Sequence, residues 1–435
     1  MKVIITPSKA CGTIQAPPSK SMAHRMLICA GCAEGTSIIR NIDFSEDILA
    51  TIDCLRALGA EITCGEHSVA VRGVDIRKGG EATGVCGAGA VQESGRAADG
   101  NVRVSCIAAG EEMTAALACR ESGSTLRFMI PLCLLNGRKY EFTGSSSLFE
   151  RPLSVYEKIC GEQGLSFWRK DNRLLVSGTL AAGDYEIPGN VSSQFISGLL
   201  FALPLLHGDS RIRLIPPVES RPYISMTLQV MEYFGVEAVW EEDCTIAVRG
   251  GQKYLARDAR VEGDYSNAAF FDALNYVGGD VTVEGLESRS LQGDKVYRQF
   301  FDRIAEGYAE IDIADCPDLG PILMVLAAMR HGARLTGTAR LRLKESDRGA
   351  AMREELGKAG VVVEVRENEV LVAAGAGAPG EVLRGHGDHR VVMALAVLLT
   401  RVGGELDGAE AVAKSLPDFW EKLEELMVSG TINFC

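Results

Sequence analysis

The chain has 435 residues, of which 46% are hydrophobic and 24% are charged. This length favours two or three domains, and no stretch reaches the ~20 consecutive apolar residues of a membrane-spanning helix. The formal net charge is −13, which argues against binding to duplex nucleic acid through its phosphates. The first residues lack the apolar core and cleavage site of a signal peptide. We therefore expect a cytoplasmic globular protein with neither membrane nor nucleic-acid partners.

The thirteen cysteines are scattered along the chain, and only Cys29 and Cys32 form a C-x-x-C motif. Both lie in a stretch rich in alanine and leucine. This predicts two small buried residues on a helix rather than a redox or zinc centre. A disulfide framework is not expected in a long chain without a secretion signal.

A first pattern recurs six times: the end of an apolar helix, a glycine, and a run of β-forming residues. Its glycines are Gly35, Gly137, Gly208, Gly279, Gly332 and Gly404. Each glycine suits a left-handed helix end that leads into a strand. The preceding helices, such as residues 195–206 and 390–400, are strongly apolar, so we expect them to be buried.

A second pattern lies between copies of the first: helix, glycine, strand, turn, strand, glycine. Its two glycines are 14 or 15 residues apart, in the pairs Gly59–Gly73, Gly164–Gly178, Gly235–Gly250 and Gly360–Gly375. Such runs predict short hairpins after a helix. Both patterns together predict an α/β protein of about six units in two lobes of three; ordinary α/β alternation without duplication is the alternative. Residues 79–113, rich in Gly, Ala and Ser, predict a surface insertion.

The first candidate site residues lie where a helix is expected to begin, in the run PPSKSMAHR. Ser19 suits the N-cap position, so Lys20 and Ser21 would lie in the first turn, with Arg25 one turn later. Because a helix N-terminus attracts anions, this predicts an anion site. The alternative is an ordinary cap beside surface charges.

Three further segments of the N-terminal half carry the same residue types. Their candidates are Gly123 in the turn Ser122–Thr125, Arg127, Arg151, and the run Ser192, Ser193 and Gln194. A glycine in such a turn would let a ligand approach the backbone closely. Taken singly, a serine at a helix start is usually only a cap.

The C-terminal half adds charged clusters near helix starts. They hold Asp318; Lys344, Glu345, Asp347 and Arg348; Asp388, His389 and Arg390; and Lys414. If the helix starts of both halves converge, they form one deep polyanion site, because arginine suits carboxylate and phosphate. Asp318 and Glu345 would then be available for proton transfer. The alternatives are solvated surface charges and a metal site at His386, Asp388 and His389, which no further His or Cys cluster supports.

Between residues 17 and 419, ten motifs together resemble the 5-enolpyruvylshikimate-3-phosphate synthase family of enolpyruvyl transferases. They are PPSKSMAHR, ESGSTLR, ERPL, SSQF, ESRPYI, GDYSNAAFF, PDLGPIL, LKESDR, DHRVVMALAV and KSLPDF. The resemblance implies the two-lobed enolpyruvyl-transferase fold, an inside-out α/β barrel whose lobes each contain three βαβαββ repeats with buried helices. It implies a lobe of residues 1–18 and 262–435 on the phosphoenolpyruvate side, a central lobe of residues 19–261 on the shikimate 3-phosphate side, and an active site between them.

The resemblance also implies transfer of the enolpyruvyl group of phosphoenolpyruvate to the 5-hydroxyl of shikimate 3-phosphate, releasing phosphate through a tetrahedral intermediate, in chorismate and aromatic amino-acid biosynthesis. By motif match, the shikimate 3-phosphate ligands would be Lys20, Ser21, Arg25, Ser192, Ser193, Gln194, Ser220, Tyr223, Asp318 and Lys344. The phosphoenolpyruvate ligands would be Lys20, Gly123, Arg151, Gln194, Arg348, Arg390 and Lys414. Asp318 would accept the hydroxyl proton, and Glu345 with Lys20 would handle the methylene and methyl protons. No metal or organic cofactor is implied, and we expect a monomer.

The sequence departs from the family motifs at Arg340, where some members carry a substrate-binding asparagine, and at Glu121, where asparagine is common. Two other functions remain as alternatives. UDP-N-acetylglucosamine enolpyruvyl transferases share the fold and the donor, but the Lys20–Ser21 pair favours the shikimate acceptor. A non-catalytic binding protein of the same fold would not need Lys20, Asp318, Glu345 and Arg390 together, and the acidic net charge argues against an RNA-end-processing relative.

Overall fold

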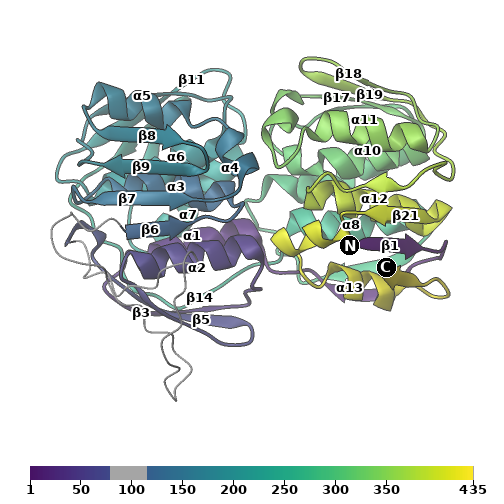
Figure 1. The fold of residues 1–435 in the computed structure, drawn as a ribbon, viewed down its shortest axis with the longest axis horizontal. Helices are drawn as coiled ribbons and strands as arrows, with labels where there is room; N and C mark the ends of the chain where they lie inside the picture. Colours follow the sequence, from purple (N-terminus) through teal and green to yellow (C-terminus); the bar gives the residue numbers. More distant parts are fainter. Residues whose placement is uncertain (79–114, 435) are drawn as a thin grey trace.

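The computed structural model describes residues 1–78 and 115–434. The predicted surface insertion, residues 79–113, lies outside the described residues. Two lobes lie side by side, with the middle of the chain in one and both chain ends in the other (Figure 1). No helix in the described part of the chain is both long and apolar enough to cross a membrane. The predicted two-lobed α/β architecture is confirmed.

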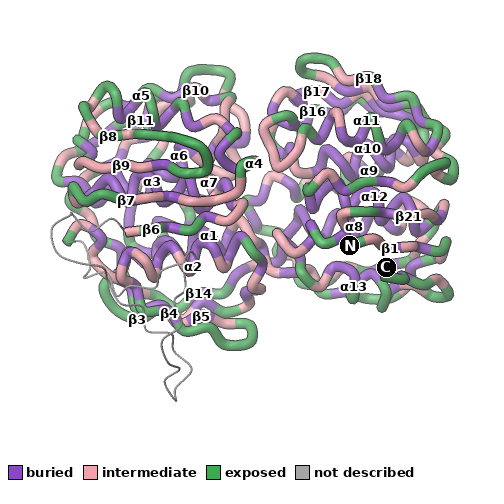
Figure 2. Tube along the Cα trace, viewed as in Figure 1, coloured by how far each residue is buried: buried purple, intermediate pink, exposed green. Residues whose placement is uncertain are grey.

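Each lobe has its own hydrophobic core. The core of the central lobe is made of residues between Met22 and Val261, and that of the terminal lobe of residues 3–14 and 265–432. Buried segments run through the middle of each lobe, whereas exposed segments lie mainly at the outer turns (Figure 2). Two separate cores make the lobes distinct packing units.

Three four-stranded sheets of one pattern belong to the central lobe. In each, the first two strands are parallel and the other neighbours are antiparallel. In spatial order the strands are β14 (Ala259–Arg260), β3 (Gly35–Arg40), β5 (Ser68–Gly73) and β4 (Glu61–Cys64); β6 (Ala115–Ala118), β7 (Lys139–Thr143), β9 (Arg173–Ser177) and β8 (Ser166–Lys170); and β10 (Asp184–Pro188), β11 (Ser210–Ile215), β13 (Thr245–Val248) and β12 (Ala238–Glu242). The pairing of β14 with β3 joins the two ends of this lobe's chain.

The terminal lobe repeats the pattern twice and adds a smaller parallel sheet. In spatial order its strands are β16 (Ala309–Asp312), β17 (Ala333–Thr336), β19 (Glu369–Val372) and β18 (Val363–Val365); β20 (Leu383–Arg384), β21 (Gly404–Asp407), β1 (Lys2–Ile5) and β22 (Ile432–Phe434); and β15 (Asp280–Glu284) with β2 (Cys11–Gln15). Because β1 pairs with both β21 and β22, the N-terminal strand completes a sheet of C-terminal residues. This pairing brings both chain ends into one lobe.

The helices lie between the sheets. Those of the central lobe are α1 (Lys20–Gly31), α2 (Glu46–Ala57), α3 (Gly123–Cys133), α4 (Ser146–Glu150), α5 (Ser154–Glu162), α6 (Ser193–Ala202) and α7 (Arg221–Tyr233). Those of the terminal lobe are α8 (Tyr265–Tyr276), α9 (Tyr297–Glu306), α10 (Gly320–Met329), α11 (Arg348–Lys358), α12 (His389–Val402) and α13 (Phe419–Leu426). Short 3-10 helices precede several of them: η3 (Gly293–Val296), η4 (Pro317–Leu319), η5 (Ala339–Leu343) and η6 (Ala409–Lys414).

Burial explains why helices occupy the interior and sheets the outside. Every residue of α12 from His389 to Thr400 is buried, as is every residue of α10 from Gly320 to Ala328. A helix that is apolar on all sides must be surrounded by protein. Strand β11 instead alternates buried and exposed residues, so its sheet faces solvent on one side. The predicted buried helices are confirmed, and the inside-out barrel consists of separate sheets around helices.

The two sequence patterns correspond to particular strands. All six predicted post-glycine strands are present as β3, β7, β11, β15, β17 and β21, and all four predicted hairpins as β4–β5, β8–β9, β12–β13 and β18–β19. The left-handed glycine is present at Gly137 (φ 74°) and Gly332 (φ 80°). The prediction of a left-handed glycine is wrong at Gly208 and Gly279. The 3-10 helix η2 (Leu203–Leu205) ends α6 before Gly208, and the glycine preceding Gly279 takes the positive φ of 106° instead.

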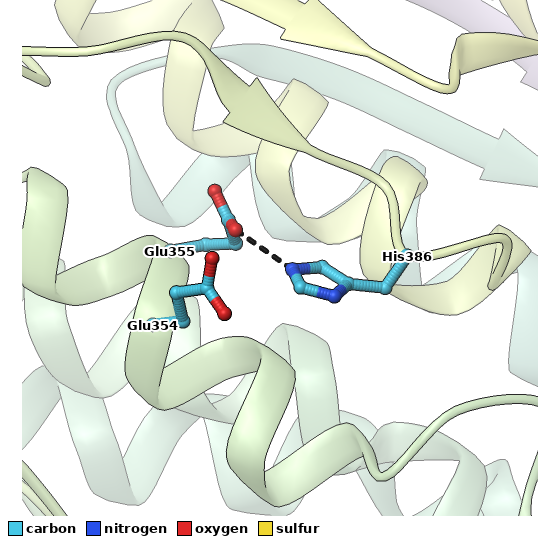
Figure 3. A group of neighbouring side chains, drawn as sticks. All are labelled: Glu354, Glu355 and His386. Carbon is cyan, nitrogen blue, oxygen red and sulfur yellow. Dashed lines mark hydrogen bonds and ion pairs between the residues drawn. The ribbon is translucent and has the colours of Figure 1, made fainter.

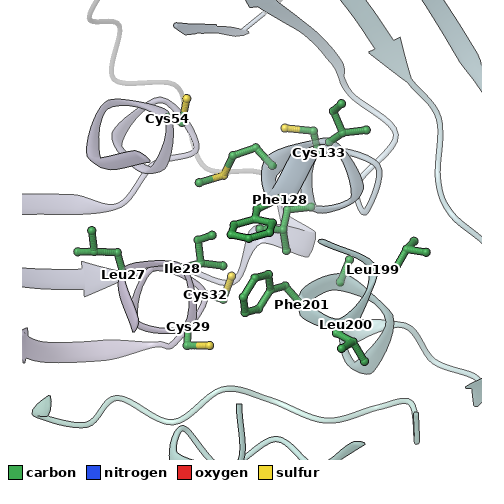
Figure 4. Packing of buried hydrophobic residues seen from close by; sticks show 14 of the residues in the cluster. Leu27, Ile28, Cys29, Cys32, Cys54, Phe128, Cys133, Leu199, Leu200 and Phe201 are labelled. Carbon is green, nitrogen blue, oxygen red and sulfur yellow. The ribbon is translucent and has the colours of Figure 1, made fainter. Parts of the chain in front are cut away.

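The C-x-x-C cysteines belong to the central core. Cys29 on α1 and Cys32, which follows the helix, are 0% and 5% exposed, and they pack near Phe128 of α3 and Phe201 of α6 (Figure 4). Burial raises the pKa of both thiols well above its ordinary value. These thiols therefore remain protonated and unreactive at neutral pH, in line with the predicted packing role.

The chain passes between the lobes at two points that lie against each other. Pro18 forms an antiparallel bridge with Gly263, and Ser19 N donates a hydrogen bond of 2.8 Å to Glu262 O. Helices α1 and α8 begin directly after these two segments. Lys20, the first residue of α1, is thus placed at the boundary between the lobes.

Candidate active site

Four of the predicted site segments begin at capped helix starts. The caps are Ser19 on α1, Ser122 on α3, Ser192 on α6 and Asp388 on α12, and each side chain accepts a hydrogen bond from a backbone N–H of the first turn. These residues therefore have the ordinary capping role. The same caps fix the direction in which the next residues of each helix point.

One pocket between the lobes gathers most of the predicted site residues. The central lobe contributes Lys20, Ser21, Arg25, Asp47, Gly123, Ser124, Arg127, Phe128, Arg151, Pro152, Val191, Ser192, Ser193, Gln194, Ser220 and Tyr223; the terminal lobe contributes Asp318, Arg340, Leu343, Lys344, Glu345, Arg348 and His389. Among the predicted substrate ligands, Arg390 and Lys414 are the two outside this lining. Seven lining side chains are cationic and three are carboxylates, so the pocket is cationic although the chain carries −13. Such a pocket attracts anions.

Arg348 connects the carboxylates of the terminal lobe. It is 1% exposed, and it donates hydrogen bonds of 2.8 Å from Nε to Asp388 Oδ2, from Nη1 to Asp318 Oδ1 and from Nη2 to Glu345 Oε2. Burial alone would lower the pKa of Arg348, but the three carboxylates raise it well above its ordinary value. Its planar, permanently charged group therefore sets the positions of all three carboxylates.

The two candidate acid–base carboxylates are both ionised. Burial would raise the pKa of Asp318, but Lys344, Arg348 and Arg390 outweigh burial and hold it well below its ordinary value. The Lys344 ammonium lies 3.1 Å from Asp318 Oδ1. Burial likewise opposes ionisation of Glu345, and Arg348 with the central-lobe cations Arg151 and Lys20 holds its pKa well below the ordinary value. Each carboxylate is therefore an anion at neutral pH.

Lys20 lies between groups of both lobes. Its ammonium is 2.8 Å from Asp47 Oδ2 in the central lobe, and its backbone N–H donates to Asp264 Oδ2 at 3.1 Å. Burial, followed by the charge of Lys20, holds the pKa of His389 well below its ordinary value, so this imidazole is neutral. Asp47 is not among the site residues predicted from the sequence. Its only local signal is an acidic residue in the first turn of a helix, which the helix dipole already explains.

Buried guanidinium groups organise the central-lobe side of the pocket. Arg25 Nη2 donates to Tyr223 O at 3.0 Å. Arg127 Nη1 donates to Gln194 Oε1 at 2.7 Å, and Gln194 Nε2 donates to Ser124 Oγ at 2.9 Å. Burial lowers the pKa values of Arg25 and Arg127 to about 10, so both remain cationic at neutral pH. These contacts place polar groups at the pocket wall.

Arg151 is the lining cation with the most unused hydrogen-bonding capacity. It is 8% exposed, and its buried Nε and Nη2 have no hydrogen-bond partner among the described residues. A Cβ added at Gly123 would lie 3.0 Å from Arg151 Nη1 and 2.9 Å from Arg127 Nη1. Gly123 thus leaves room for two neighbouring cations, which repel each other unless an anion lies between them.

Arg390 and Lys414 lie just outside the lining. Arg390 Nη1 donates to Asn267 Oδ1 at 3.0 Å, and its Nη2 lies 3.8 Å from Asp318 Oδ2. Arg390 therefore lies close to Asp318 without lining the pocket. Lys414 forms an ion pair with Glu121 of the opposite lobe. Glu121 would have to release Lys414 before that ammonium could bind a ligand.

Comparison with known proteins identifies the family. The model of the EPSP synthase (3-phosphoshikimate 1-carboxyvinyltransferase) family matches residues 4–84 and 89–423. The chain belongs to the EPSP synthase family. The resemblance drawn from the ten motifs is confirmed.

Individual relatives match this chain along nearly its full length. It is 36% identical over 447 residues to the 3-phosphoshikimate 1-carboxyvinyltransferase of Clostridium perfringens strain ATCC 13124, with 98% of both chains covered. It is 37% identical over 445 residues to that of Clostridium beijerinckii, with 97% of this chain and 96% of the relative covered. Among solved structures, the EPSP synthase of Acinetobacter baumannii matches with a TM-score of 0.74 at 22% identity, with 100% of both chains covered. This likeness confirms the predicted enolpyruvyl-transferase fold.

The three residues considered for a metal site make separate contacts in this family member. Asp388 is bound to Arg348, and His389 lines the pocket. His386 instead extends toward α11, where its Nε2 lies 2.7 Å from Glu355 Oε1, with Glu354 nearby (Figure 3). Other groups also occupy Glu355: the Lys358 ammonium is 2.9 and 2.8 Å from its two oxygens. The Lys358 ammonium is thus already bound to the buried carboxylate of Glu355.

The Glu355 cluster yields a stability prediction. Glu355 is 0% exposed, so Glu355→Ala leaves the Lys358 charge without its buried partner. We expect the free energy of unfolding, measured by urea denaturation, to fall by about 3–5 kcal/mol. Glu354→Ala is the matched control: this neighbour is 52% exposed and 3.7 Å from the same ammonium, so a loss under about 1 kcal/mol is expected. Equal losses in the two variants would contradict the assignment of Glu355 as the buried partner of Lys358.

Asp294 is a buried carboxyl beside the pocket that the sequence analysis missed. It is 3% exposed; Tyr223 Oη donates to its Oδ2 at 3.0 Å, and its Oδ1 has no partner among the described residues. Burial, assisted by the charge of Asp318, raises the pKa of Asp294 to about 7. The motif ESRPYI supplied Tyr223, but no sequence signal placed residue 294 across from it.

The raised pKa of Asp294 predicts a pH-dependent stability difference. Between its ordinary pKa of 3.8 and about 7, the folded protein keeps a proton that the unfolded chain has released, so this group destabilises the fold increasingly as pH rises. Asp294→Asn keeps an acceptor for Tyr223 without the charge. We expect it to be more stable than the unmodified protein by at least about 1 kcal/mol at pH 8, with the advantage shrinking toward pH 4. Urea unfolding at several pH values measures this, and a pH-independent difference would contradict it.

Proposed function

We propose that this protein transfers the enolpyruvyl group of phosphoenolpyruvate to the 5-hydroxyl of shikimate 3-phosphate, releasing phosphate. The observation that carries the proposal is the pocket between the lobes, where seven cations surround the carboxylates Asp318, Glu345 and Asp47. Both substrates carry a carboxylate and a phosphate, so their binding requires concentrated positive charge. The names of the curated relatives support the same reaction.

The proposed ligand assignment follows the lobes. Shikimate 3-phosphate would bind mainly to the central-lobe wall, through Lys20, Ser21, Arg25, Ser192, Ser193, Gln194, Ser220 and Tyr223, with Asp318 and Lys344 from the other side. Phosphoenolpyruvate would bind to Lys20, Gly123, Arg151, Gln194, Arg348, Arg390 and Lys414. The unpartnered nitrogens of Arg151 support a bound anion at that position. Two domains, residues 19–261 and residues 1–18 with 262–435, would then enclose both substrates, as their separate cores suggest.

The chemistry consists of an addition and an elimination. Asp318 takes the proton of the 5-hydroxyl as its oxygen bonds to C2 of the enolpyruvyl group. Glu345, which is an anion in the free protein and must first gain a proton, protonates the methylene carbon with the assistance of Lys20. The resulting tetrahedral intermediate loses phosphate from C2, and the departing phosphate takes the proton held by Asp318. One methyl proton returns to Glu345, which restores the double bond. Each proton donor and acceptor is thus regenerated.

Substrate charge adjusts the basicity of Asp318 in this scheme. In the free protein its pKa is held well below the ordinary value, by Lys344, Arg348 and Arg390 against the effect of burial. A phosphoenolpyruvate carboxylate bound to Arg348 and Arg390 would share these cations and weaken their hold on Asp318. Because an opposite charge nearby is what lowers a carboxyl pKa, sharing it makes Asp318 a better base when the substrate is present.

The proposal is tested by phosphate release from phosphoenolpyruvate, measured with shikimate 3-phosphate or UDP-N-acetylglucosamine as the acceptor. Release with shikimate 3-phosphate only is the expected result. Release with the nucleotide sugar only would keep the fold and overturn the acceptor. Release with neither, from folded protein, would favour a non-catalytic binding protein. We further propose that the enzyme is a monomer, which size-exclusion chromatography with light scattering tests, and that it acts in the cytoplasm.

A further inference from the structure

The departure at Arg340 leads to an inference that rests on the proposed function. Arg340 belongs to the terminal lobe, but its contacts are largely with the central lobe. Its Nε lies 2.5 Å from Glu219 Oε2, with the two side chains 7% and 14% exposed, and its Nη1 donates to Ser220 Oγ at 2.9 Å. Its Nη2 donates to Ala314 O within its own lobe. Nη1 and Nη2 therefore donate hydrogen bonds to protein groups, whereas Nε makes an ion pair with Glu219 without a hydrogen bond.

The segment Glu219–Tyr223 is held by the opposite lobe at several points. Arg221 N donates to Asp315 Oδ1 at 3.2 Å, and Tyr223 Oη donates to Asp294 Oδ2 at 3.0 Å. A Cβ at Gly293 would lie 3.0 Å from the Pro222 ring, so the two lobes approach closely here. This segment also carries Ser220 and Tyr223, two of the proposed shikimate 3-phosphate ligands.

Ser220 shows how Arg340 could set the geometry of this segment. Its backbone is left-handed, with φ of 57°, a conformation that is unfavourable for a residue other than glycine. Its hydroxyl makes no capping hydrogen bond to α7; it is bound to Arg340 instead. The interactions of Arg340 with Glu219 and Ser220 therefore offset the cost of this conformation.

We propose that Arg340 is a positioning residue, which holds the segment Glu219–Tyr223 in the conformation that binds shikimate 3-phosphate and acts through Glu219 and Ser220 rather than on the substrate. A direct ligand and a positioning residue give opposite results at Glu219. If Arg340 bound substrate itself, removing the charge of Glu219 would free its guanidinium and leave substrate affinity unchanged or improved. If Arg340 positions the segment, removing either partner weakens binding.

The experiment compares Arg340→Asn, Glu219→Gln and the double variant by steady-state kinetics and by calorimetric titration with shikimate 3-phosphate. We expect each single variant to raise KM and Kd for shikimate 3-phosphate about 10-fold, with kcat and the KM for phosphoenolpyruvate changed less than about 3-fold. The double variant should resemble the singles, because both remove the same interaction. If Arg340→Asn fails to fold, Glu219→Gln still tests the positioning role.

The matched control is Arg77→Asn, which removes a partly buried pair with Asp75, 2.8 Å long, inside the central lobe alone. It should lower stability without changing the KM for shikimate 3-phosphate. Unchanged or tighter binding in Glu219→Gln would overturn the positioning role, as would equal increases in both KM values or a similar effect of the control. An unmodified protein that neither binds nor turns over shikimate 3-phosphate would overturn the proposed function, and this inference with it.

Discussion

Replacing Asp318 by alanine should reduce phosphate release at least ~100-fold while shikimate 3-phosphate continues to bind. The variant loses the group proposed to accept the hydroxyl proton. It keeps Lys344, Arg348 and Arg390, whose charges are no longer balanced by this carboxylate. An anionic substrate should therefore find at least as much positive charge as before. Turnover and calorimetric titration with shikimate 3-phosphate measure the two effects separately.

Two controls make the Asp318 result specific. Asp318→Asn keeps the size of the side chain and a hydrogen-bond acceptor for Arg348 but cannot accept the proton, so it should be nearly as inactive as alanine. Asp280→Asn removes an exposed carboxylate on β15 and should leave turnover unchanged. Near-normal turnover in Asp318→Asn would remove Asp318 from the mechanism. Loss of both binding and turnover in equal measure would assign it to substrate binding alone.

Replacing Arg348 by methionine is expected to damage both the fold and the reaction. The change leaves Asp318, Glu345 and Asp388 without the guanidinium that lies 2.8 Å from each. Breaking a buried ionic contact of this kind costs about 3–5 kcal/mol of unfolding free energy. Loss of one cation from the proposed phosphoenolpyruvate site should also reduce kcat by roughly 100- to 1000-fold. Urea unfolding and phosphate release measure the two losses.

The loss of unfolding free energy in Arg348→Met should depend on pH. In the unmodified protein the pKa values of Asp318 and Glu345 lie below their ordinary 3.8 and 4.5, so their favourable contribution is complete at neutral pH and is lost as pH falls below this range. In the variant the unpaired carboxylates oppose folding most strongly at neutral pH. The stability difference should therefore be largest near pH 7 and shrink toward pH 4.

Arg211→Met is the matched control for Arg348. Arg211 Nε also donates to a carboxylate, Glu241 Oε2, at 2.9 Å, but the two side chains are 53% and 40% exposed. A solvated pair of this kind contributes little, so the control should lose under about 1 kcal/mol and keep its activity. A similar small loss in Arg348→Met would mean that its network does not hold the terminal lobe together.

The sequence by itself determined the repeating units, the capped helix starts and most of the pocket. Caps, hairpins and buried helices depend on hydrogen bonds and apolar patterns within short segments. The helix starts at Ser19, Ser192 and Asp388 can therefore be recognised from a few neighbouring residues. The order of the motifs also indicated the family. The left-handed glycine failed at Gly208 because a 3-10 turn intervenes, which the residue pattern around it does not reveal.

Only the tertiary structure decided which charged groups meet. Lys20 is paired with Asp47, Tyr223 with Asp294, and Arg340 with Glu219. The last two pairs join residues from different lobes. Such contacts depend on how completed lobes dock, and a charged residue in sequence has many possible partners of opposite sign. The residue types therefore specified an anion site, whereas docking of the lobes decided which cations face the pocket and which are bound to carboxylates.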